Sequence, residues 1–251
     1  MIATERLARE CAFHDQQASQ RAATFVAEPH RLQFADADYL DHESWVRPAF
    51  AKLGNVRGRD VLDYGCGHGM AAVVLARGGA RVTACDLSGG YVTEARRRAA
   101  ANDVHVDCTQ ADGERLPFAA GSFDAVWGHA ILHHLDVPTA SRELKRVLRP
   151  GGVWVLCEPW GENPFLRVAR RWLPYAGKGH TADEEPLREP QVRQLADVFG
   201  RVEVEGFQLL SMLRRAWPGP ASLLHRGDER LLGRWPSLKR YARYVVLTAR
   251  A

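Results

Sequence analysis

Short apolar runs rich in β-branched and aromatic residues alternate with helical patterns from about residue 59 onward. The runs that predict strands are residues 60–64, 81–85, 104–108, 123–127, 153–157, 202–209 and 244–249. The segments that predict helices are residues 70–77, 90–101, 138–148, 164–172 and 191–199, with Ser88 as the N-cap of the second. This alternation is typical of an α/β fold in which a mostly parallel sheet carries helices on both faces.

The region before the first strand has a mainly helical pattern and supplies no strand. We therefore divide the chain into a helical N-terminal cap, residues 1–58, and a sheet domain, residues 59–251. The sheet domain carries two insertions, at about 159–190 and 210–242. A length of 251 residues, 46% of them hydrophobic, suits one large globular domain with such an appendage.

Charge distribution and cysteine content argue against several classes of protein. The 34 basic and 30 acidic residues are interspersed, and the basic ones occur in short separate groups, which argues against a nucleic-acid track. The five cysteines form no Cys-x-x-Cys pair and lack the density of a secreted disulfide scaffold. No apolar leader and no run of bilayer-spanning length stands out in the sequence. We expect a cytoplasmic protein without membrane or nucleic-acid partners.

The segment 61–69, Val-Leu-Asp-Tyr-Gly-Cys-Gly-His-Gly, leads from a strand straight into a glycine turn and a helix. Gly65 and Gly67 let the backbone turn tightly and approach a ligand with no Cβ in the way. Taken alone, this spacing fits either a structural turn or half of a nicotinamide-nucleotide fingerprint. The residues around the loop are needed to distinguish a structural turn from a nucleotide-binding loop.

Three aspartates follow three consecutive predicted strands. Asp63 would repel a pyrophosphate at the first strand end but attract an ammonium group. Asp86 ends the next strand, where a carboxylate can accept both ribose hydroxyls. Asp112 follows the third, where it could accept from an exocyclic adenine amine while Leu87 packs on the ring. Each aspartate alone could instead cap a turn, but together they describe a ligand made of an amino acid, a ribose and an adenine.

Six motifs in order and spacing resemble the class I S-adenosylmethionine-dependent methyltransferases, in the broad small-molecule group that includes quinone and natural-product enzymes. They cover roughly residues 58–158 and lie at 61–69, 84–88, 111–118, 122–127, 131–135 and 143–152. The resemblance implies a Rossmann-like seven-stranded sheet with an antiparallel last strand. It also implies S-adenosyl-L-methionine as cofactor, with S-adenosyl-L-homocysteine as product. The cofactor-binding residues expected from these motifs are Asp63, Gly65, Cys66, Gly67, Asp86, Leu87, Asp112, Gly113 and His129.

Two residues are candidates for the catalytic step. His133, in Leu132-His-His-Leu135, and Glu158, at the end of the fifth strand, should both face the crevice at the carboxyl edge of the sheet. The arrangement resembles O-methyltransferases in which these groups act together on an acceptor hydroxyl, the acid orienting the imidazole that accepts the proton. The alternative is that the histidine hydrogen-bonds backbone at a helix start. For His129 the resemblance implies a contact to the methionine part of the cofactor through the main chain.

The resemblance also suggests which segments cover the site. In the cap, a lid over the cofactor would include His14, Tyr39, His42 and Trp45. Between the fifth and sixth strands, the acceptor pocket would draw on Trp160, Asn163, Arg167, Tyr175 and His180, and a carboxylate or phosphate of the acceptor could be held by Arg167, Arg170 and Arg171. Packing and solvation are the competing explanations for these side chains. No metal is expected, because neither histidines nor cysteines have ligand spacing.

The sequence thus predicts methyl transfer to a small-molecule acceptor, with oxygen as the favoured atom. Carbon methylation of a quinone-like or natural-product acceptor is the nearest alternative. A nicotinamide-dependent oxidoreductase would share the glycine loop but leave Asp63 and Asp112 unexplained, and a non-catalytic cofactor-binding module is a third possibility. Nucleic-acid methylation is disfavoured, because residues 127–130 lack a segment for stacking a flipped base. A homo-oligomer stays open.

Overall fold

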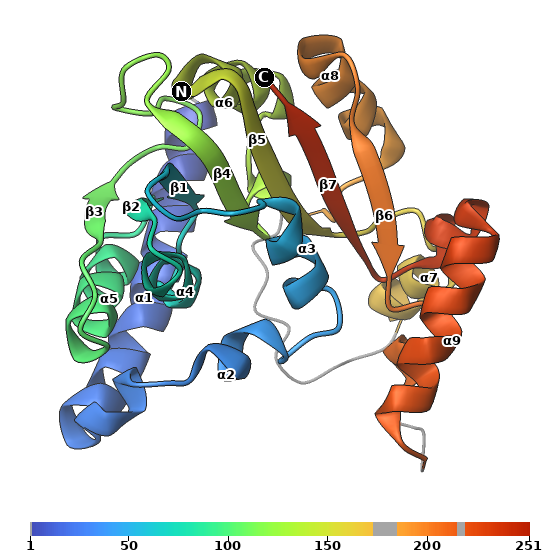
Figure 1. Ribbon diagram of the computed structural model, residues 1–251, viewed down its shortest axis with the longest axis horizontal. Helices are drawn as coiled ribbons and strands as arrows, with labels where there is room; N and C mark the ends of the chain where they lie inside the picture. Colours follow the sequence, from blue (N-terminus) through green and yellow to red (C-terminus); the bar gives the residue numbers. More distant parts are fainter. Residues whose placement is uncertain (1, 173–184, 215–218) are drawn as a thin grey trace.

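The computed structural model describes residues 2–172, 185–214 and 219–251, and Figure 1 shows their arrangement. A seven-stranded sheet has the order β3-β2-β1-β4-β5-β7-β6. Its strands are β1 Asp60–Tyr64, β2 Arg81–Asp86, β3 Asp107–Gln110, β4 Phe123–His129, β5 Leu148–Pro159, β6 Glu203–Phe207 and β7 Tyr244–Arg250. β7 runs antiparallel to both β5 and β6, whereas the pairs from β3 to β5 are all parallel. This is the predicted Rossmann-like sheet.

Helices surround the sheet (Figure 1). They are α1 Ile2–Ala27, α2 Asp36–Leu40, α3 Val46–Lys52, α4 Met70–Arg77, α5 Gly89–Ala101, α6 Val137–Val147, α7 Pro164–Trp172, α8 Glu189–Phe199 and α9 Ala221–Arg234. Short 3-10 helices are η1 Pro29–Leu32, η2 Leu132–His134, η3 Ser211–Leu213 and η4 Pro236–Tyr241. The predicted N-cap is confirmed, since Ser88 Oγ accepts from the Tyr91 amide at 3.1 Å. Among these elements no helix is both long and apolar enough to cross a bilayer.

The third strand was predicted three residues too early, at 104–108. The Val104 amide still bonds the Ala99 carbonyl at 3.1 Å, and Asp103 has a positive φ of 54°, so the chain is leaving α5 at this point. Pairing with β2 begins only at Asp107, opposite Thr83. An apolar Val-x-Val pattern alone did not reveal this helix ending.

An apolar layer covers each face of the sheet, because successive side chains of a strand point to opposite faces. Val61 and Val155 pack in one layer with α3 and α4. Leu62 and Leu156 pack in the other with α6 and α8. Helices therefore cover both faces, and the carboxyl ends of the central strands are fixed in position.

Residues 2–58 supply no strand, as predicted, and α1 lies along α5 (Figure 1). Asp15 Oδ1 accepts hydrogen bonds from Ser88 Oγ at 2.5 Å and from the Gly90 amide at 3.0 Å. These bonds lower the pKa of Asp15. Arg21 pairs with Glu94 of α5 at 2.8 Å. The cap is thus joined to the start and middle of α5 by polar contacts.

Candidate active site

A cavity of about 240 Å³ lies at the carboxyl ends of β1, β2 and β4, between them and the cap helix α1. The fold brings to it all the residues that the motifs assigned to the cofactor. They are Asp63, Gly65, Cys66, Gly67, Asp86, Leu87, Asp112, Gly113 and His129. Their convergence from the ends of four strands, β1 to β4, makes this cavity the candidate cofactor site.

The glycine turn is shaped by its backbone. The amides of Gly65 and Cys66 both donate to the Cys85 carbonyl at 2.9 Å, which ties the turn to the end of β2. Gly65 has a φ of +70°, and a Cβ there would lie 2.7–2.9 Å from three carbon atoms of Ile131. Only glycine meets both conditions without strain.

Asp63 is an acidic group without a counter-charge on the described residues. Its side chain is 2% exposed, and its Oδ2 is buried with no hydrogen-bond partner among them. Burial raises the pKa of Asp63 to about 7, and the charge of Asp86 adds to this rise, while the Ala72 amide opposes it. A cation arriving from the cavity would satisfy the free oxygen and favour ionisation. The ammonium of an amino-acid ligand fits this requirement.

Asp86 and Asp112 each make local hydrogen bonds as well as lining the cavity. Asp86 accepts from the Gly67 amide at 2.8 Å and the Ser88 amide at 2.9 Å, yet burial still raises its pKa. Asp112 accepts from the Glu114 amide at 2.9 Å, so it also serves its own turn. A carboxylate has about four lone-pair sites, which leaves both residues acceptor capacity for ribose hydroxyls or an amine.

The two predicted catalytic residues are in contact. His133 Nδ1 lies 2.7 Å from Glu158 Oε2, and Glu158 Oε1 accepts from the amides of Ile131 at 3.1 Å and Leu132 at 2.8 Å. Burial of Glu158 would raise its pKa, but these hydrogen bonds and the imidazole bring it below the ordinary value. Glu158 is thus an ionised, fully buried acceptor that orients the ring of His133.

His133 does not itself line the described cavity, although its neighbours Ile131 and His134 do. His129 lines it, is partly exposed, and has a ring whose centroid lies 4.6 Å from that of Trp45 and 6.2 Å from that of Tyr244. Burial lowers the pKa of His129 to about 4, so its imidazole is neutral. The side chain of His129 is therefore a packed wall of the site.

The four predicted lid residues separate into two groups. His14 and Tyr39 line the cavity. Trp45 is 1% exposed and stacks on Tyr244 at 5.1 Å, and His42 Nδ1 contacts the Tyr39 carbonyl at 2.5 Å. Neither Trp45 nor His42 lines the cavity, and the packing of Trp45 against β7 agrees with the packing explanation for that residue.

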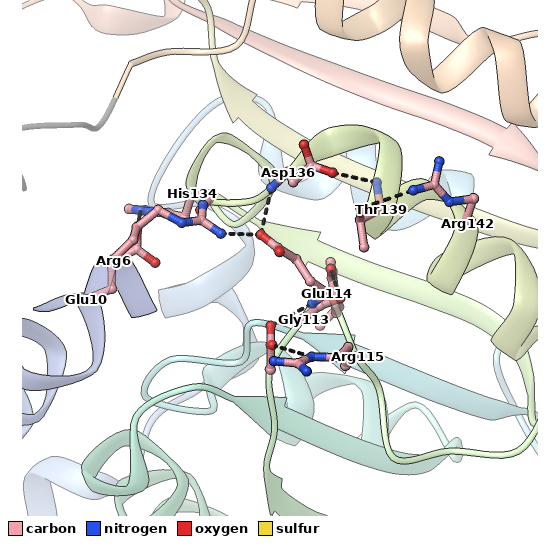
Figure 2. A network of polar contacts seen from close by, with 11 residues as sticks. Arg6, Glu10, Gly113, Glu114, Arg115, His134, Asp136, Thr139 and Arg142 are labelled. Carbon is pink, nitrogen blue, oxygen red and sulfur yellow. Dashed lines mark hydrogen bonds and ion pairs between the residues drawn. The ribbon is translucent and has the colours of Figure 1, made fainter. Parts of the chain in front are cut away.

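A polar network joins the cap to the site, as Figure 2 shows. Arg6 of α1 donates to the carboxylate of Glu114 and to the carbonyl of His134. Glu114 also accepts from the Asp136 amide at 2.8 Å, and Glu10 lies 3.8 Å from His134 Nδ1. Three segments are held together here: α1, the turn after β3 and the turn that contains His133 and His134.

The predicted acceptor segment is only partly described. Trp160 is fully buried in the core, and Asn163 caps α7 by accepting from the amides of Phe165 at 3.0 Å and Leu166 at 3.2 Å. Neither lines the described cavity: Trp160 belongs to the core and forms a bridge with Leu187, and Asn163 is used by the start of α7. Arg167 is exposed on α7. Tyr175 and His180 lie outside the described residues, as do the side chains of Arg170 and Arg171.

Sequence reasoning missed several residues that line the cavity, notably Leu7, Glu10, His68, Tyr91 and His134. Glu10 and His14 are four residues apart on α1, a spacing that places both on one helix face. His68 lies inside the glycine loop, between Gly67 and Gly69, so its place in the sequence could have indicated that it lines the cavity. Within the described parts of the chain no cluster of metal-ligand side chains occurs.

Comparison with known proteins settles the family. A model described as a methyltransferase domain matches residues 62–156. A malonyl-[acyl-carrier protein] O-methyltransferase of Enterobacter lignolyticus is 39% identical, over 82% of this chain and 79% of its own length. This chain belongs to the methyltransferase family. A demethylmenaquinone methyltransferase of Beutenbergia cavernae is 32% identical to this chain. The match covers 75% of this chain and 73% of the Beutenbergia protein.

The fold agrees with this assignment. The solved structure of an S-adenosylmethionine-dependent methyltransferase from Mesorhizobium loti superposes with a TM-score of 0.59 at 24% identity, and covers 84% of this chain and all of that one. This methyltransferase uses S-adenosylmethionine, as the motifs predicted. The free Oδ2 of Asp63 fits the cofactor's ammonium. The family assignment favours a methyltransferase over the oxidoreductase and over the non-catalytic module.

Proposed function

We propose that this methyltransferase transfers the methyl group to a hydroxyl of a small molecule, with His133 as the general base and Glu158 as the residue that positions it. The observation that carries the proposal is the 2.7 Å contact between His133 Nδ1 and Glu158 Oε2. A buried carboxylate accepts the Nδ1 proton, so the other ring nitrogen, Nε2, is the one that takes the acceptor proton. The cofactor supplies the electrophilic methyl group on its sulfonium.

The need for a base depends on the acceptor. A neutral hydroxyl must lose its proton as the oxygen attacks the methyl carbon, and a positioned imidazole contributes about 100- to 10,000-fold to such a step. A carboxylate acceptor is already ionised near neutral pH and requires no base. The His133–Glu158 pair therefore supports a hydroxyl acceptor.

The cofactor residues are assigned roles on the same basis. We infer that Asp63 binds the ammonium, that Asp86 accepts from the ribose hydroxyls, and that Asp112 accepts from the adenine amine beside Leu87. Gly65, Cys66, Gly67 and Gly113 give the backbone its close approach to the cofactor, and His129 contributes its main chain. Support comes from the convergence of these residues on one cavity.

Carbon methylation of a quinone-like acceptor is the second candidate. It is favoured by the 32% identity to a demethylmenaquinone methyltransferase. In that reaction the same imidazole would remove a proton from the activated ring instead of a hydroxyl. The two candidates differ in the atom that carries the new methyl group, so product analysis separates them.

An acceptor panel tests the proposal. Purified protein with S-adenosylmethionine would receive catechol, demethylmenaquinone or malonyl-coenzyme A, and S-adenosylhomocysteine release would be followed by mass spectrometry. We expect turnover with hydroxyl acceptors and a methyl group on oxygen in the fragmented product. Turnover confined to the quinone with a ring-carbon product would support the second candidate, and turnover confined to the malonyl thioester would contradict the need for a base.

A further inference from the structure

The lining of the cofactor cavity is unbalanced in charge. Four carboxyl groups reach it, from Glu10, Asp63, Asp86 and Asp112, whereas no lysine or arginine of the described residues does. The cofactor, however, carries a carboxylate next to its ammonium on the methionine α-carbon. A buried carboxylate needs hydrogen-bond donors, so some other group of the cavity has to receive it.

His68 is in the right place to be that donor. It follows Gly67 in the loop that leaves β1, five residues after Asp63, and it is one of the residues that line the same cavity. His68 Nδ1 is buried and has no hydrogen-bond partner among the described residues. Burial first, and then the charges of Arg21 and Arg98, lower the pKa of His68 to about 3. The imidazole is therefore neutral, with one N–H to donate.

The residues behind His68 favour an anion in front of it. Arg98 Nε donates to the His68 carbonyl at 2.8 Å, and the Arg98 side chain is only 4% exposed. Arg98 and Arg21 share a single carboxylate, that of Glu94, at 2.9 and 2.8 Å. The two arginines and Glu94 together leave one net positive charge near His68, with Arg98 buried and Arg21 partly exposed.

The other histidines of the cavity are placed differently. His129 packs its ring against Trp45 and Tyr244. His14 and His134 lie 5.7 Å from one another by their ring centroids, and both act electrostatically on Asp86, the residue assigned to the ribose. His68 is therefore the cavity histidine whose side chain is available near Asp63, because it lies in the loop that directly follows β1.

We propose that His68 donates a hydrogen bond to the methionine carboxylate of S-adenosylmethionine, so that the end of β1 and the loop after it hold both charged groups of the amino acid: ammonium on Asp63 and carboxylate on His68. The inference rests on the cofactor and is independent of the acceptor and of His133. It makes His68 a binding residue that selects for the intact amino acid.

Calorimetric titration of the cofactor-free protein tests this with two ligands. S-adenosylhomocysteine carries the carboxylate, and its decarboxylated analogue retains the amine, ribose and adenine. A hydrogen bond to a charged group corresponds to about 10- to 100-fold in affinity. We expect His68→Ala to weaken S-adenosylhomocysteine by about that factor while changing the affinity for the decarboxylated analogue by less than about 2-fold. His68→Asn, which restores an N–H donor, should recover part of the loss.

Two further variants serve as controls. Asp63→Asn should weaken both ligands, because both present the amine. His105→Ala removes a histidine that is exposed on the surface and should change neither affinity. Equal weakening of both ligands by His68→Ala, or no weakening at all, would overturn the inference, as would equal affinity of the wild-type protein for the two ligands. Loss of acceptor turnover with unchanged ligand discrimination would instead concern the proposed function.

Discussion

Glu158 holds His133 in one orientation: its Oε2 lies 2.7 Å from Nδ1 of the imidazole, while Oε1 receives two backbone amides of the same turn. One carboxylate thus fixes both the ring and the turn that carries it. Because Glu158 lies near the end of β5 and pairs with Val245 of β7, its position is set by the sheet rather than by the loop. This arrangement makes the pair sensitive to changes of a single atom.

The substitution Glu158→Gln tests which ring nitrogen of His133 carries the proton. The amide oxygen can still accept from the Ile131 and Leu132 amides, but the amide nitrogen would donate to His133 Nδ1 and move the ring proton to Nε2. We expect kcat to fall by about 100-fold or more with little change in the affinity for S-adenosylhomocysteine. Steady-state kinetics and calorimetry measure the two quantities. A near-normal kcat with a hydroxyl acceptor would contradict the base assignment.

Ionisation of Asp63 should make cofactor affinity depend on pH. Its pKa of about 7 in the cofactor-free protein means that it is largely protonated below pH 6 and ionised above pH 8. Because the ammonium favours the ionised form, affinity should rise as pH increases, by up to about 10-fold per unit below pH 7. Calorimetry across pH 5.5–8.5 measures this, and Asp63→Asn is expected to flatten the profile.

The buried carboxyl group of Asp63 should reduce the free energy of unfolding of the cofactor-free protein. Its pKa is raised from 3.8 to about 7 in the folded chain, so the folded state resists ionisation and the destabilisation grows as pH rises between these values. Asp63→Asn removes this term. We expect the variant without cofactor to be more stable than wild type at pH 8, by roughly 1–4 kcal/mol, and about equally stable at pH 4. Urea unfolding of both proteins at pH 4 and pH 8 measures the difference. A variant that is less stable than wild type at pH 8 would contradict the raised pKa of Asp63.

The cap network should control how long the cofactor stays bound. Arg6→Ala breaks the contacts of α1 to Glu114 and to the His134 carbonyl. Loss of these partly buried contacts should speed S-adenosylhomocysteine dissociation by about 2- to 10-fold, measured by stopped-flow fluorescence. Arg31→Ala, which removes an exposed arginine paired with Glu28, is the matched control and should leave the rate unchanged. Equal rates in all three proteins would show that the cap is not coupled to the site.

The glycine turn offers a matched pair of substitutions. Gly65→Ala combines a left-handed φ with a Cβ less than 3 Å from Ile131, whereas Gly58→Ala has a similar φ of +70° and open space around the new Cβ. Strain alone costs about 1–2 kcal/mol. Gly65→Ala should lose more stability than Gly58→Ala and also bind cofactor more weakly, which thermal unfolding and calorimetry would show.

Local patterns predicted the sheet well because its strands are bounded by turn residues and its layers follow a period of two. The carboxylates at strand ends were predictable for the same reason, since a parallel sheet gathers such positions at one edge. The first part of β3 was misplaced, because α5 continues to bond the chain through Val104. That boundary depends on pairing with β2, which no local pattern reveals.

Contacts made by the cap were harder to predict. That Glu10 faces the cavity follows from how α1 docks on α5, a tertiary event set by pairs such as Asp15 with Ser88. Trp160 resembled a pocket residue by its place in the chain, but it belongs to the core. His68 was not predicted, because the burial of its ring nitrogen without a partner depends on tertiary packing that the local sequence does not show.

A crystal structure of the protein soaked with S-adenosylhomocysteine tests the central claim most directly. The three aspartates at the ends of consecutive strands predict the homocysteine ammonium against Asp63, the ribose hydroxyls on Asp86 and the adenine amine at Asp112. Density for the nucleoside outside this cavity, or bound in the reverse direction along the three strand ends, would contradict it.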